Sequence, residues 1–233
     1  MKTYRKHTAH WRVALARSAV AQSLILLKNE EDVLPLKSPV NKIRVAGSAA
    51  DNVGVQMGAW SIEWQGVDGN WPPNSTSILA GIEEVAGVNT VIEYARNGQF
   101  SADSMKAAVG IAVVGELPYA EGWGDNPSPT LSAEDLATIQ NLRSSSESVI
   151  VVLVTGRPLI ITEHVKDWDA LVVAWLPGSQ GAGVADVLFG KKEFTGTLPL
   201  PWPASTRQLP ITLSDQTKDN SELLFPRYFG LEY

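Results

Sequence analysis

The chain has 233 residues, of which 44% are apolar, so it can bury a core of its own and does not read as a disordered chain. Its 19 basic and 25 acidic residues give a net charge of −6, which argues against a surface for nucleic acid or an anionic membrane. The absence of cysteine excludes disulfide scaffolds, thiolate metal sites and cysteine nucleophiles. The only histidines, His7, His10 and His164, are too scattered for a convincing metal site, so we expect neither a metal nor a cofactor.

The first predicted element is a long helix from His7 to Lys28, because apolar residues such as Trp11, Leu15 and Ala19 recur at mostly helical spacing without Gly or Pro. Arginines interrupt any apolar signal core in this segment, and the longest apolar runs are far too short to span a bilayer. We therefore expect a soluble protein without a membrane partner. No compartment follows from the sequence, although a periplasmic or secreted location would suit a longer parent.

The rest of the chain alternates short β-branched runs with helix-like stretches. Strands are predicted at Ile43–Gly47, Thr90–Tyr94, Val109–Gly115, Ser148–Thr155 and Ala170–Leu176. Helices are predicted at Thr76–Ala86, Ser132–Arg143, Leu159–Val165 and Gly181–Phe189, with Ser132 as an N-cap. The alternation predicts an α/β domain around a mainly parallel sheet, and no linker divides residues 1–233.

In such a sheet, ligands bind beyond the carboxyl ends of the strands, so the loops there are the places to look for chemistry. The first such loop carries Trp60, Trp64 and Trp71 among glycines, with Glu63 and Gln65 between them. Indole faces suit the apolar faces of sugar rings, and nearby amides and carboxylates can bind hydroxyls. The alternative is that these rings plug the base of a long loop or face a neighbouring domain.

The second loop, from Gly115 to Asp125, places three carboxylates and two aromatic rings directly after an apolar strand. In that setting a partly desolvated carboxyl can keep its proton near neutral pH and act as a general acid. Glu116, next to the strand, is better read as a structural partner for Arg157, whereas Glu121 lies further out between Tyr119 and Trp123. The alternative for any one of these acids is an ordinary solvated side chain.

The glycine-rich stretch 178–183 lacks the order of a phosphate-binding motif, and Ser179 does not lie in a nucleophile elbow. The missing phosphate motif and the acidic net charge disfavour a nucleotide-binding domain. The missing nucleophile elbow disfavours a serine hydrolase.

Together these segments resemble the C-terminal α/β-sandwich domain of glycoside hydrolase family 3, in the branch of β-glucosidases and exo-1,3/1,4-β-glucanases. The stretches that carry the resemblance run through the whole chain: 16–36, 45–52, 58–66, 114–125, 156–158, 174–178, 194–199 and 224–231. The resemblance implies a three-layer α/β/α sandwich with a mainly parallel sheet of about six strands flanked by helices. It also implies a retaining mechanism with two carboxyl groups about 5–5.5 Å apart.

The resemblance assigns the acid/base to Glu121, the glutamate of the P-Y-x-E segment. It places Trp64 against the sugar at the leaving-group subsite, with Trp60 supporting the same wall. We add Glu63, Trp123 and Tyr119 as substrate-binding residues, and Glu116, Asp125 and Arg157 as structural support.

The family's nucleophilic aspartate lies in a preceding (β/α)8 barrel, and no segment of this chain matches its motif. The leading hypothesis is therefore half of an active site for a β-glucoside or β-glucan oligosaccharide, completed by a family barrel domain in cis or in trans and inactive without it. The alternative is a non-catalytic β-glucan-binding module built on the same tryptophans.

Overall fold

The computed structural model describes residues 2–37, 40–101, 105–211 and 222–233, and the side chains of these from residue 11 onward. Its centre is a six-stranded sheet in the order β1-β6-β5-β4-β2-β3. All neighbouring strands are parallel except the edge pair of β1 and β6, which is antiparallel. The strands are β1 (Ile25–Asn29), β2 (Lys42–Ala46), β3 (Val91–Tyr94), β4 (Ala107–Gly115), β5 (Ser146–Val154) and β6 (Ala170–Trp175).

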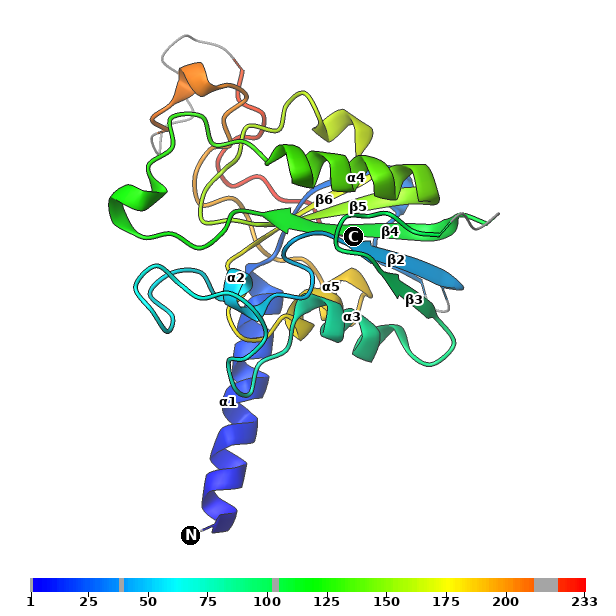
Figure 1. Ribbon diagram of the computed structural model, residues 1–233, viewed down its shortest axis with the longest axis vertical. Helices are drawn as coiled ribbons and strands as arrows, with labels where there is room; N and C mark the ends of the chain where they lie inside the picture. The colour runs from blue at the N-terminus through cyan, green and yellow to red at the C-terminus, as the bar shows by residue number, and fades with distance from the viewer. Residues whose placement is uncertain (1, 38–39, 102–104, 212–221) are drawn as a thin grey trace.

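Helices cover both faces of this sheet (Figure 1). One face packs against α1 (Lys2–Ser23), α2 (Val53–Met57), α3 (Ile78–Ala86) and α5 (Ala182–Leu188). The other face packs against α4 (Ala133–Ser145) and the segment around Leu198 and Trp202. Two separate apolar clusters result, one on each side of the sheet, and the three-layer α/β/α sandwich expected from the sequence is confirmed. Within the described ranges, every helix is too short or too polar to cross a bilayer.

The long first helix is predicted too far, because it ends at Ser23 and Ile25 begins an edge strand. Ile25 and Leu27 enter the cluster on the α4 face, whereas Leu26 enters the opposite cluster, so alternate side chains are buried on the two faces. The Leu26 carbonyl also accepts a hydrogen bond from the Leu231 amide at 2.9 Å. Tertiary pairing thus overrides an apolar run whose spacing also suited a helix.

The predicted helix at Leu159–Val165 is wrong. Ile160 instead pairs with the loop before α4, donating its amide to Pro129 at 2.7 Å, and the Leu159 carbonyl accepts from the Trp202 indole at 2.8 Å. Distant partners thus satisfy the backbone groups of Leu159 and Ile160. A single turn follows, in which the Ile161 carbonyl accepts from the His164 and Val165 amides at 2.9 and 3.0 Å, and it leads into the 3-10 turn Val165–Asp167.

The start of α4 is set by its own side chains. The Ser132 hydroxyl accepts the Asp135 amide at 3.0 Å, as the N-cap prediction requires, and donates to the Asp135 carboxylate at 2.9 Å. The Ser48 hydroxyl, in the loop after β2, donates to the same carboxylate at 2.9 Å. Asp135 therefore ties the start of α4 to the loop that leads toward the tryptophans. Burial raises the pKa of this carboxyl above its ordinary value, and the two hydroxyl donors oppose the rise.

This raised pKa predicts a pH-dependent stability. The folded chain holds the Asp135 proton more tightly than the unfolded chain. The contribution of this proton to the free energy of unfolding is therefore fully present below the ordinary pKa of an aspartate, and it is lost as the pH rises through the raised pKa of Asp135. Asp135→Asn removes this titration. In urea denaturation from about pH 3 to about pH 7, we expect the free energy of unfolding of the wild type to fall relative to that of the variant. A difference that stays constant, or that grows in favour of the wild type, would contradict the assignment, and Glu147→Gln is the exposed control.

Candidate functional site

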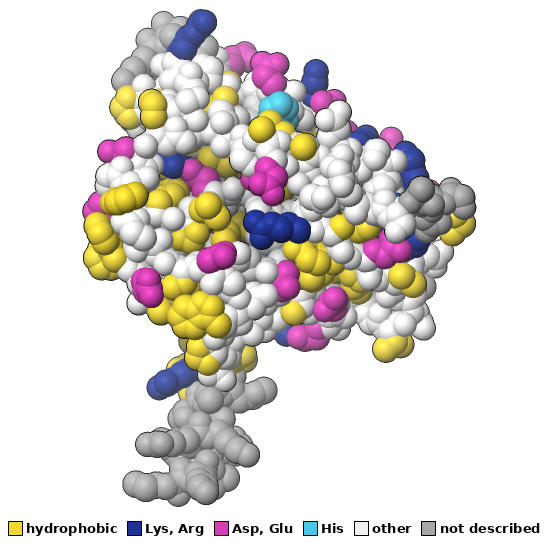
Figure 2. All heavy atoms as spheres, viewed as in Figure 1, with side chains coloured by type: hydrophobic (Ala, Val, Ile, Leu, Met, Phe, Trp, Pro, Cys, Tyr) yellow, Lys and Arg dark blue, Asp and Glu magenta, His cyan; other side chains and the backbone are white. Residues whose placement is uncertain are grey.

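The candidate site lies at the carboxyl edge of the sheet, where the loops after β2 and β4 meet. In the view of Figure 1 both loops extend to the left of the sheet, and Figure 2 shows hydrophobic and acidic side chains gathered over that region. Large apolar residues in these loops are exposed, namely Trp60, Ile62, Trp64, Leu117 and Trp123. Exposed aromatic rings at the edge where α/β sheets bind ligands indicate a binding surface.

The loop from Gly58 to Gly66, which we call the tryptophan loop, is closed by its own backbone. The Trp60 amide donates to the Trp64 carbonyl at 3.2 Å, and the Gly66 amide donates to the Glu63 carbonyl at 3.0 Å. Gly66, at φ +84°, lies against Pro118, where an added Cβ would be 2.4 Å from the proline Cβ. Only glycine permits both this backbone angle and this close approach. The tryptophan loop therefore rests directly on the loop after β4.

The two rings of this loop form an open wall. The centroids of Trp60 and Trp64 are 6.4 Å apart with their planes inclined at 57°, and the two side chains are 71% and 48% exposed. The Glu63 side chain between them is exposed as well. Such a wall offers apolar faces to a flat ligand and a carboxylate to its hydroxyl groups.

Glu121 begins the 3-10 turn Glu121–Gly124 and has a left-handed backbone, with φ +47°. Its carboxylate accepts a hydrogen bond from the indole nitrogen of Trp64. The structure thus brings together two residues that are 57 positions apart in the chain. Trp123, in the same turn, is 81% exposed. An exposed carboxylate that is held at the edge of an aromatic ring can exchange a proton with a bound ligand.

Glu116 has a different environment. Its Oε1 accepts from Arg157 Nε at 2.9 Å and Nη2 at 2.6 Å, while its Oε2 accepts from the Thr155 hydroxyl at 2.7 Å and the Tyr119 hydroxyl at 3.2 Å. Both oxygens are therefore engaged in holding the loop. We call Glu116 and Arg157 the anchor, because their ion pair joins the ends of two strands to the loop.

Arg157 extends this anchor toward the Glu121 turn. Its Nη1 donates to the Gly124 carbonyl at 2.6 Å, and its guanidinium carbon lies 4.5 Å from the centre of the Tyr119 ring. Burial, followed by the negative charge of Glu116, raises the pKa of Tyr119 to about 12, so its hydroxyl remains a donor at neutral pH.

Tyr119 and Asp125 therefore differ in their surroundings from what the sequence assignment implies. Tyr119 is half-buried and its hydroxyl donates to Glu116, whereas the sequence analysis expects it to bind the substrate. Asp125 is exposed after the turn, and none of the contacts that hold Glu116 and Arg157 uses its side chain.

The sequence offers the Gln65 amide to ligand hydroxyls, whereas the structure bonds it to the backbone of Ala120. Its Oε1 accepts the Ala120 amide at 2.9 Å, and its Nε2 donates to the Ala120 carbonyl at 3.2 Å. The only sequence signal is an amide side chain in a glycine-rich loop, which does not reveal its partner.

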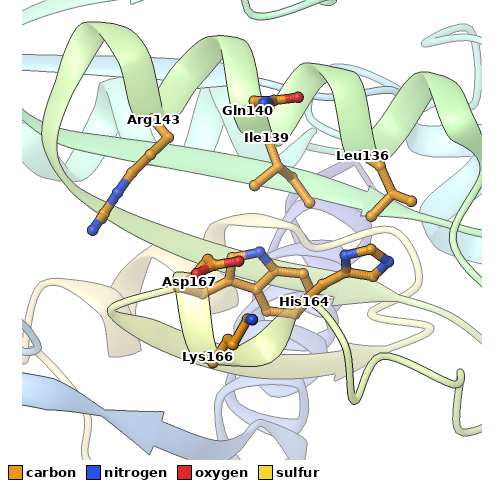
Figure 3. A pocket seen from close by; sticks show the side chains of 8 residues that line it. Leu136, Ile139, Gln140, Arg143, His164, Lys166 and Asp167 are labelled. Carbon is orange, nitrogen blue, oxygen red and sulfur yellow. The ribbon is translucent and has the colours of Figure 1, made fainter.

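A hollow of about 510 Å3 lies away from these loops, between α4 and the 3-10 turn before β6 (Figure 3). Arg143 projects from α4, and His164, Lys166 and Asp167 come from the turn below. Trp168 lines it but is buried, so it offers no free ring face. Across the side chains that the structure describes, no group of three or more His, Asp or Glu residues is arranged to hold a metal ion, and those of His7 and His10 lie outside that set.

The fold is that of an α/β-sandwich domain, and the loops at the carboxyl edge of its sheet carry exposed aromatic and acidic side chains. The chain belongs to glycosyl hydrolase family 3: the model of that family's C-terminal domain matches residues 24–233. The expected family is thereby confirmed.

Solved and curated relatives agree with this membership. The crystal structure of an exo-1,3/1,4-β-glucanase, ExoP, from a Pseudoalteromonas species is 36% identical with a TM-score of 0.82, over 95% of this chain and 37% of that one. A lysosomal β-glucosidase of Dictyostelium discoideum is 29% identical over 94% of this chain, and a periplasmic β-glucosidase of Salmonella typhimurium is 30% identical over 85%. The chain spans 29% of the length of each of these two relatives.

The anchor leads to a stability prediction. Arg157→Met leaves the Glu116 carboxylate mostly buried without its cation, so we expect a loss of about 1–3 kcal/mol in the free energy of unfolding. Faster amide exchange should accompany it at residues 122–125. Arg143→Met is the control, because Arg143 forms a more exposed pair with Asp169 and should cost about 0–1 kcal/mol. Equal losses in the two variants would show that the anchor has no special importance.

Proposed function

We propose that this chain supplies the general acid/base and an aromatic subsite to a retaining β-glucosidase or exo-β-glucan hydrolase. The observation that carries the proposal is the hydrogen bond from the Trp64 indole to the Glu121 carboxylate, because it fixes an exposed aromatic ring, through its N–H edge, to a group that can move a proton. Family membership supports the reaction class. The names of the relatives, β-glucosidases and an exo-1,3/1,4-β-glucanase, support β-linked glucosides as substrates.

In this proposal Glu121 acts twice. Protonated, it donates its proton to the glycosidic oxygen as the bond to the sugar breaks. As a carboxylate, it then takes a proton from the water molecule that releases the sugar from the enzyme. Its exposure on the 3-10 turn leaves room for a leaving group to approach, whereas the oxygens of Glu116 are already occupied.

The aromatic wall positions the leaving-group side of the substrate. Trp64 would stack on that sugar with Trp60 extending the wall, and the exposed Trp123 would flank the same space. Glu63 would accept hydrogen bonds from sugar hydroxyls. Tyr119 belongs, through its contacts, with the supporting residues Glu116 and Arg157.

A retaining mechanism also needs a nucleophilic carboxylate about 5–5.5 Å from the acid/base. We assign that group to a barrel domain of the family, joined to this chain or provided by another one. The loops around Glu121 would then form one wall of a site that two domains share, with a β-glucoside or β-glucan oligosaccharide between them.

The first test is hydrolysis of an aryl β-glucoside. We expect no turnover by the 233-residue chain alone and turnover when a family barrel domain is added. Glu121→Gln should reduce the recovered rate by about 100-fold or more, since general acid–base catalysis contributes about 10²–10⁴-fold. Hydrolysis by the chain alone that disappears in Glu121→Gln would contradict the division of labour between the domains.

A second test separates catalysis from simple glucan binding, which the exposed rings of Trp60, Trp64 and Trp123 also favour. Trp64→Ala should weaken oligosaccharide binding about tenfold, or about 1.4 kcal/mol, by calorimetry. Trp64→Phe keeps a ring but loses the donor to Glu121, so it should retain most of the affinity while the rate of the complemented enzyme falls. Trp71→Ala is the control, an exposed ring whose indole donates to Asp68 instead. If Glu121→Gln binds normally and the complemented wild type never hydrolyses, the binding-module alternative is correct.

A further inference from the structure

The tryptophan loop and the Glu121 loop meet along three consecutive residues. Gly66 lies against Pro118, Gln65 bonds to Ala120, and Trp64 bonds to Glu121. The order of contacts runs in opposite directions along the two segments, as in a short antiparallel pairing. In the central contact of the three, the Gln65 side chain bonds to the backbone of Ala120.

Gln65 satisfies both polar backbone groups of one residue. Its amide accepts the Ala120 N–H at 2.9 Å and donates to the Ala120 carbonyl at 3.2 Å. Ala120 itself is buried and extended, with φ −136° and ψ +151°. A side-chain amide is suited to this double contact because it carries one acceptor and a donor on the same planar group.

The residue fixed in this way directly precedes Glu121. Glu121 has a left-handed backbone at φ +47°, a conformation that a non-glycine residue keeps only when its surroundings hold it. On the far side of the turn, Arg157 holds the Gly124 carbonyl at 2.6 Å. Gln65 holds the near side. The backbone on either side of Glu121 is thus held by a polar contact, one before and one after the turn, while the Trp64 indole bonds to its carboxylate.

We propose that Gln65 is a positioning residue for the general acid/base, setting the place of Glu121 through the backbone of Ala120. The inference rests on the proposed role of Glu121. Proton donation needs the acid within hydrogen-bond reach of the leaving oxygen, so a displaced Glu121 slows glucosides whose leaving group must be protonated. Glucosides that leave as stable anions are hardly affected.

The test compares two leaving groups in the chain complemented by a family barrel domain. Gln65→Met has a similar length but makes neither hydrogen bond. We expect its kcat/KM to fall about 10- to 100-fold for methyl β-glucoside and less than about threefold for 2,4-dinitrophenyl β-glucoside, with KM little changed. Gln65→Glu retains an acceptor for the Ala120 amide and should recover part of the loss. Gln140→Met, on the exposed face of α4, is the matched control and should behave as wild type.

A second readout uses the chain alone. Exchange of the Ala120 amide hydrogen should be faster in Gln65→Met than in wild type or Gln140→Met, with the far-UV circular dichroism unchanged. Equal losses for both glucosides, or unchanged Ala120 exchange, would overturn the positioning role. If Glu121→Gln itself shows no dependence on the leaving group, the proposed function fails. If Glu121→Gln shows it and Gln65→Met does not, only the present inference fails.

Discussion

The candidate site depends on the contact between the tryptophan loop and the loop after β4. Neither loop belongs to a helix or a strand of the core, and three contacts join the two loops. Trp64 donates to Glu121, Gln65 bonds to both backbone groups of Ala120, and Gly66 packs on Pro118. The parallel sheet makes this meeting possible because it ends β2 and β4 side by side at one edge. Without this contact, an aromatic loop and an acidic loop would be two unrelated surface segments.

The ion pair of Glu116 and Arg157 supports that contact from the sheet side. It stands at the ends of two neighbouring strands, β4 and β5, and reaches the Glu121 turn through the Gly124 carbonyl. The carboxylates of Glu116 and Glu121 lie in one loop but have different surroundings. Glu116 is saturated by donors and holds structure, whereas Glu121 is exposed and has one tryptophan donor. Sequence position relative to the strand is the simplest indicator of this difference.

Much of the fold could be predicted from the sequence, because β-branched runs and capping residues act locally. All five predicted strands are present, and Ser132 caps α4 as expected. The errors at Leu24–Lys28 and Leu159–Val165 share one cause, which is pairing with distant segments such as Leu231 and Pro129. The loops that form the candidate site were also identified, but the contact of Gln65 with Ala120 was not. A side chain that bonds to backbone 55 residues away leaves no periodicity or spacing to read.

The tryptophans illustrate the same limit. Trp168 and Trp202 are buried in the core, whereas Trp60, Trp64, Trp71 and Trp123 are exposed at loops, and composition alone does not separate these groups. The exposed tryptophans are distinguished in the sequence by the glycines that surround them. This local sequence, more than the number of tryptophans, indicates a binding surface on these loops of a glycosyl hydrolase family 3 domain.

The central claim is that Glu121 is the acid/base of a site completed by a barrel domain. The most direct measurement is the product formed by the complemented Glu121→Ala variant from 2,4-dinitrophenyl β-glucoside in the presence of azide. This substrate needs no acid to form the glucosyl-enzyme, and a small anion can then attack where the base is missing. The account predicts accumulation of β-glucosyl azide with a rate that rises with azide concentration. Release of glucose at the wild-type rate, with no azide product, would contradict it.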